Sequence, residues 1–152
     1  MKQFVDNAGR SWGVMINVDT IRRVRDSLNV DLLAAVEGKL IERLVNDPIL
    51  LCDVIYVICK SEAGQRGVTD DDFGRAMAGD AIDQATASLL EELVSFFPKG
   101  RRELLTKALG KFRQLESKAI SLVDQQLDDP QMEQKVLSQL KQRLSELKTS
   151  GD

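Results

Sequence analysis

The sequence of 152 residues predicts a mainly α-helical protein: an N-terminal β-hairpin packed on a helical bundle, followed by a C-terminal amphipathic helical hairpin. Two observations predict this fold class. Apolar residues alternate with other residues only near the N-terminus, whereas further along they recur at the three- and four-residue spacing of helices. Capping residues, glycines and the three prolines separate these helical stretches. With 43% hydrophobic and 30% charged residues, the composition is that of a globular chain long enough to bury a core.

Residues 3–18 predict the hairpin. Phe4 and Val5 form a short first strand, and the Asp-Asn-Ala-Gly sequence of residues 6–9 supplies turn chemistry. The period-two pattern of the second strand predicts one buried face, made of Trp12, Val14, Ile16 and Val18. Trp12 has two interpretations, because its ring can fill the hairpin core or anchor a partner near an open sheet edge.

Three helices are predicted next. Asp19 or Thr20 can cap a helix that ends at Leu28, and residues 32–45 repeat apolar residues at helical spacing. The apolar positions of that second helix are Leu33, Val36, Leu40 and Leu44. Asp47 and Pro48 form a strong start signal for a third helix, since proline at the first helical position loses no hydrogen bond. That helix is apolar on most sides, so we expect it at the centre of the core.

Residues 64–67 are predicted to form a loop, and Thr69 to cap a short helix whose first turn carries Asp70, Asp71 and Asp72. Gly79 is predicted to be the C′ residue that ends that helix, and Asp80 to cap the next one, which ends before Pro98. The buried stripe of this longer helix is expected at Ile82, Ala85, Leu89, Leu93 and Phe96, with Glu91 and Glu92 on a solvated face.

After Pro98 the chain predicts a separate helical extension. We divide the protein into residues 1–98, with ten Lys/Arg and sixteen Asp/Glu, and residues 99–152, with eleven and eight. A long amphipathic helix reaches Leu127, and Asp128, Asp129 and Pro130 start the last helix. This last helix carries leucines at the 3–4–3 spacing of a coiled-coil seam: Leu137, Leu140, Leu144 and Leu147. The seam suits one partner helix, either the preceding one or one from another chain, so it is our candidate protein-binding site together with Trp12.

The residue inventory argues against an enzyme. The chain has no histidine, and therefore lacks the most common general base and metal ligand. No phosphate-binding glycine motif occurs, and adjacent acids such as residues 70–72 diverge by about 100° around a helix, so they do not converge on one metal ion. Cys52 and Cys59 are seven residues apart on one predicted helix, too distant for a disulfide. We expect no cofactor, metal or catalytic residue.

The composition also limits the expected cellular location of the protein and the kinds of partner that it binds. The acids that interrupt the basic tail are not typical of a nucleic-acid footprint. The N-terminus lacks the apolar segment of a signal peptide, and no apolar run has the length of a membrane span. We therefore expect a cytoplasmic protein that binds neither nucleic acid nor membrane, and that self-associates through its last helix.

Residues 3–98 carry a series of short motifs in a fixed order. The first is an F-x-D-x-x-G-R turn, made of Phe4, Asp6, Gly9 and Arg10. The others are residues 21–25 (IRRVR), 30–33 (VDLL), 47–53 (DPILLCD), 67–82 (GVTDDDFGRAMAGDAI) and 96–98 (FFP). In these motifs and in the order of its elements, the segment resembles the tail assembly chaperones of long-tailed bacteriophages, prophages and gene transfer agents. Residues after 98 lie outside the resemblance.

The resemblance implies a non-enzymatic protein that coats the tape measure protein and keeps it soluble until the tail tube assembles around it. The tape measure protein is the implied partner, with the tail tube protein as a further one, both in the host cytoplasm. A frameshifted, longer second product is usual in that family. Two alternatives stay open: a structural tail or head-completion protein, and a small helical adaptor or regulator.

Overall fold

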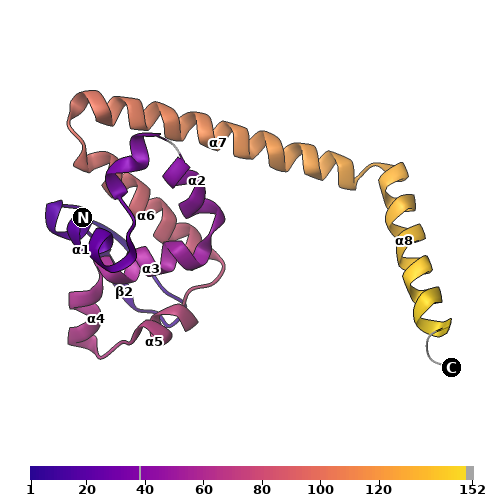
Figure 1. The fold of residues 1–152 in the computed structure, drawn as a ribbon, viewed down its shortest axis with the longest axis horizontal. Helices are drawn as coiled ribbons and strands as arrows, with labels where there is room; N and C mark the ends of the chain where they lie inside the picture. The colour runs from indigo at the N-terminus through magenta and orange to yellow at the C-terminus, as the bar shows by residue number, and fades with distance from the viewer. Residues whose placement is uncertain (38, 150–152) are drawn as a thin grey trace. The chain divides into compact units, whose positions relative to one another are not determined.

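The computed structural model describes residues 1–37 and 39–149 and confirms a mainly α-helical protein with an N-terminal hairpin (Figure 1). The chain divides into two compact units, residues 1–109 and 110–152. In order, the elements are β1 (Lys2–Val5), β2 (Ser11–Val14), α1 (Val18–Leu28), the 3₁₀ helix η1 (Leu32–Glu37), α2 (Lys39–Asn46), α3 (Pro48–Ile58), α4 (Lys60–Arg66), α5 (Asp70–Arg75), α6 (Asp80–Phe96), α7 (Lys99–Leu127) and α8 (Pro130–Thr149). Gly38, inside a predicted helix, and residues 150–152, at the end of the predicted extension, lie outside the described residues.

The hairpin forms as predicted up to residue 16. β1 and β2 are antiparallel with Phe4 opposite Trp12, and Trp12, Val14 and Ile16 are buried. Val18 was predicted to share that face, but it is 60% exposed because it is the first residue of α1.

The start of α1 corrects the predicted cap. Asn17, rather than Asp19 or Thr20, is the N-cap: its side chain accepts from the Thr20 backbone N–H at 2.9 Å. The Thr20 hydroxyl in turn accepts from the Asn17 backbone N–H at 2.9 Å, which completes a capping box. The box therefore starts the helix earlier than the period-two pattern suggested.

The predicted helix over residues 32–45 is in fact η1 followed by α2. A 3₁₀ helix has three residues per turn, so Leu32 and Ala35 share the buried face. Leu33, predicted to be buried, is 40% exposed as a result. Leu40 and Leu44 of α2 are buried as predicted.

Helix α3 is the centre of the first unit, as its apolar sequence indicated. The Asp47 carboxylate accepts from the backbone N–H groups of Ile49 and Leu50 at 3.1 and 3.2 Å, and Pro48 occupies the first turn. α1, α2 and α6 pack against α3, while α6 also lies along β1 (Figure 1). The hairpin is thereby held on the helical core.

Two turn predictions are wrong. Residues 64–67 were predicted to form a loop, but Gly64 lies in α4, and Gly67 ends that helix with a left-handed φ of 67°. Arg66 holds α4 on the hairpin, because it donates to the Ser11 carbonyl at 2.7 Å and lies 5.0 Å from the Trp12 ring centroid.

The turn at residues 79 and 80 also differs from the prediction. Gly79 does not end α5, which stops at Arg75 with Ala76 as its C-cap. Gly79 instead occupies the N-cap position of α6, with φ 59° and ψ −129°, and Asp80 is the first helical residue rather than the cap.

The first unit extends beyond the division that we placed at residue 98. Leu105 and Leu109, on the first turns of α7, are buried with the core. The compact unit therefore ends at Leu109, about three helical turns past Pro98.

Candidate protein-binding surfaces

The residues that carry the F-x-D-x-x-G-R motif form an internal polar hub. The Asp6 side chain is fully buried, and its Oδ2 accepts from Trp12 Nε1 at 2.9 Å and from Arg10 Nε at 2.8 Å. Its Oδ1 accepts from the backbone N–H groups of Ala8 and Arg10, both at 2.9 Å. Gly9 completes the turn with a φ of 79°. These interactions fix the turn and satisfy the indole, so the motif has a folding role.

The hub also holds α5 against the hairpin. Arg10 donates to the Asp72 carbonyl at 3.3 Å, and the Asn7 backbone N–H donates to the Ala76 carbonyl at 2.8 Å. Phe73 of α5 meets Trp12 edge-on with ring centroids 5.3 Å apart. The segment 67–82 and the hairpin turn, distant in sequence, are thus parts of one packed region.

Trp12 is therefore placed in the core. Its relative exposure is 0%, and both its ring and its N–H have partners within the first unit. The structure therefore supports the first interpretation of Trp12, in which its ring fills the hairpin core. The side chain has no exposed surface that a partner could contact.

The acidic residues singled out in the sequence have structural roles. Thr69 and Asp72 form a capping box, with the Asp72 N–H donating to the Thr69 hydroxyl at 3.2 Å. Glu91 is exposed as predicted, but Glu92 is only 9% exposed and pairs with the Met1 ammonium at 3.1 Å. Among the described residues no group of three or more His, Cys, Asp or Glu side chains is placed to hold a metal ion.

Both cysteines are free thiols. Cys59 is buried and its Sγ donates to the Gly13 carbonyl at 3.5 Å; burial raises its pKa to about 12. Cys52 is half-buried, and burial with the nearby Asp53 charge raises its pKa as well. Both thiols therefore stay protonated near neutral pH and are poor nucleophiles.

The predicted leucine seam of α8 lies on the surface. Leu137, Leu140, Leu144 and Leu147 are 52–68% exposed, on a helix whose described side chains are all exposed. Of the two pairings left open for the seam, the described side chains do not form the one with the preceding helix. α7 and α8 are successive helices, and all four seam leucines stay exposed.

Helix α7 adds a second exposed apolar stripe that the sequence alone did not separate from core. Leu115, Leu122 and Leu127, apolar positions of the predicted amphipathic helix, are 56–61% exposed. Their neighbours Ile120 and Val123 are also exposed, at 63% and 55%. The periodicity of core-facing and partner-facing helices is the same, so only the tertiary structure distinguishes Leu105 from Leu115.

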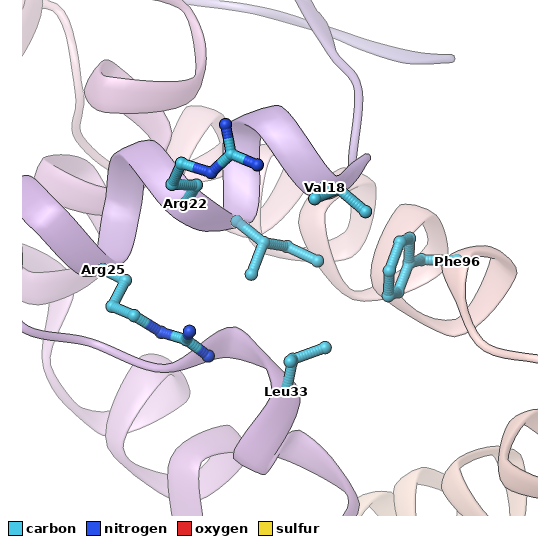
Figure 2. A pocket seen from close by; sticks show the side chains of 6 residues that line it. Val18, Arg22, Arg25, Leu33 and Phe96 are labelled. Carbon is cyan, nitrogen blue, oxygen red and sulfur yellow. The ribbon is translucent and has the colours of Figure 1, made fainter.

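The first unit carries a shallow groove that sequence reasoning missed. It has a volume of about 230 Å³ and is lined by Val18, Ile21, Arg22, Arg25, Leu33 and Phe96. Figure 2 shows Val18 and Phe96 close together, with Leu33 and the Arg25 side chain on the other side. Arg25 is paired with Asp31 at 2.9 Å, whereas Arg22 makes no ion pair in the described part of the chain. The groove lies where α1, η1 and α6 meet, so no local sequence pattern predicts it.

Within the described ranges no helix combines the length and the apolarity required to cross a bilayer. Comparison of the chain with known protein families, with curated proteins and with solved structures finds no match.

Proposed function

We propose that this protein is a tail assembly chaperone, which binds the tape measure protein in the host cytoplasm and keeps it soluble during tail assembly. It acts without catalysis or a cofactor, and the tail tube protein is a further candidate partner. The proposal rests on the resemblance of residues 3–98. The observation that supports it best is the exposed leucine seam of α8, joined by the exposed stripe of α7.

The energetics suit a reversible coat. Burying a leucine side chain contributes about 1.5–3 kcal/mol, so the four seam leucines supply several kcal/mol before ordering costs are subtracted. Many weak contacts of this kind along an extended helical partner add up through multivalency, yet each can be displaced when the tube polymerises.

The test is co-expression with the tape measure protein of the same phage or prophage. We expect the wild-type protein to move the tape measure protein from the pellet to the soluble fraction. The double variant Leu140→Glu and Leu144→Glu should lose this effect, because charges within the seam oppose its burial.

The matched control adds the same two charges to other positions of α8, as Gln139→Glu and Gln142→Glu, and should behave like wild type. An equally insoluble tape measure protein with and without the wild-type chain would contradict the proposal.

A further inference from the structure

The seam of α8 has a defined set of flanking residues. Its 3–4–3 spacing assigns Leu137 and Leu144 to heptad position a, and Leu140 and Leu147 to position d. Lys141 then occupies position e and Arg143 position g, one on each side of the leucines. These flanking positions face a partner helix and set which partner is accepted.

Neither flank carries an acid among the described side chains of α8. Gln134 and Val136 occupy the preceding e and g positions, while Glu133 precedes the leucines and Glu146 falls at an outer position. Lys141 and Arg143 are both exposed, and neither forms an ion pair within the described part of the chain. Both cations are therefore available to a partner.

The charges discriminate between two kinds of partner. An antiparallel second copy would place like flanking positions opposite each other, Lys141 beside Lys141 or Arg143 beside Arg143, which opposes pairing. In a parallel second copy Lys141 would face Val136 of the other chain and gain no opposite charge. A helix with glutamates at its own flanking positions would place an opposite charge beside each cation while its apolar seam covers the leucines.

We propose that α8 is one half of a heterotypic coiled coil, whose partner is an amphipathic helix with an apolar seam flanked by acidic residues. This inference rests on the proposed function and specifies the chemistry of the segment that is bound. It favours a different chain over the self-association expected from the seam alone.

The experiment uses the full chain and two fluorescent synthetic helices of about three heptads with the same leucine seam. One peptide has Glu at every e and g position, and the other has Lys. By fluorescence anisotropy at about 0.1 M salt, we expect the Glu peptide to bind about tenfold or more tightly than the Lys peptide. The preference should shrink at about 1 M salt, where charges are screened within a few ångströms.

Charge reversal supplies the decisive variant. Lys141→Glu with Arg143→Glu should invert the preference, so that the Lys peptide binds better, while Leu140→Glu with Leu144→Glu should abolish binding of both. All four positions are exposed, so circular dichroism should show unchanged helix content in both variants.

Equal binding of the two peptides, binding of neither, or an unchanged preference after reversal would overturn the proposal. So would a dimer mass in light scattering that falls to the monomer in Leu140→Glu with Leu144→Glu. The two proposals can fail separately. Binding of the Glu peptide without any effect on tape measure solubility would reject the chaperone role alone, whereas solubilisation that survives charge reversal would reject the acidic partner alone.

Discussion

Asp6 accepts more hydrogen bonds through its side chain than any other residue described above. Its carboxylate is fully buried and accepts from the Trp12 indole, the Arg10 guanidinium and two backbone N–H groups. Removing the carboxylate leaves the buried Trp12 N–H and two part-buried backbone N–H groups without their acceptor, whereas the Arg10 side chain is 27% exposed and can reach water. Because an unsatisfied buried donor costs about 1–3 kcal/mol, we expect Asp6→Ala to lower the free energy of unfolding by about 1–3 kcal/mol in urea titrations.

Asp19→Ala is the matched control for that variant. Asp19 pairs with Arg23 at 3.0 Å, but both side chains are about half exposed, and such pairs contribute about 0–1 kcal/mol. Equal losses in the two variants would contradict the role assigned to the hub.

The hub also makes stability depend on pH. Burial by itself raises the pKa of Asp6, but hydrogen bonds from Trp12 and Arg10 outweigh it, so the pKa lies below its ordinary value of 3.8. The unfolded chain therefore takes up the proton at a higher pH than the native chain. Stability from Asp6 is complete above about pH 5 and is lost as the pH falls below about 4, through the native pKa.

Asp31, through its hydrogen bond from Arg25, also has a lowered pKa and adds to this acid sensitivity. Urea titrations between about pH 3 and 6 should show a steeper loss of stability for wild type than for Asp6→Ala. If the pH profiles of wild type and Asp6→Ala were parallel, Asp6 would have the same pKa in the native and unfolded states, which would contradict this prediction.

At the scale of single elements, two glycines give opposite expectations for the same substitution. Gly79 precedes α6 with φ 59° and ψ −129°, a conformation that side chains with a Cβ rarely adopt, whereas Gly64 lies inside α4. An added Cβ would meet no atom within 4 Å at either position, so only the backbone decides. We expect Gly79→Ala to destabilise by about 1–3 kcal/mol and Gly64→Ala to stabilise by about 0.5–1 kcal/mol, measured by thermal unfolding. A gain in stability for Gly79→Ala would refute the assigned backbone conformation.

The sequence predicted elements best where a residue's own chemistry sets the local structure. Asp47 with Pro48 starts α3, Thr69 starts α5, and Asp129 with Pro130 separates the last two helices, because caps and prolines act within a single turn. The loop predicted at residues 64–67 failed for the opposite reason. Contacts from Arg66 to the distant hairpin stabilise a helix that Gly64 in its interior disfavours.

Candidate surfaces were predictable only in part. The α8 seam stands out from its leucine spacing, but its exposure, like that of the α7 stripe, depends on what packs against each helix. The groove beside Val18 depends on where α1 begins. The period-two pattern assigned Val18 to the second strand and so placed the start of this helix too late.

At the scale of the whole molecule, the boundary between the units is testable by truncation. A chain that ends at residue 109 keeps Leu105 and Leu109 in the first unit, whereas a chain that ends at residue 98 loses both. Each buried leucine contributes about 1.5–3 kcal/mol, so the shorter chain should unfold at a distinctly lower urea concentration. The longer chain should match the midpoint of the full protein; equal midpoints for both truncations would place the boundary at residue 98.

The single tryptophan lies deep in the first unit, where Phe73 and Arg66 surround its ring. Its emission spectrum is consequently a built-in optical reporter of melting in that unit, and it does not respond to fraying of α8. Far-ultraviolet ellipticity, by contrast, sums over every helix. Recording both signals during one heating ramp therefore resolves whether the extension melts before the body of the protein, without any added label.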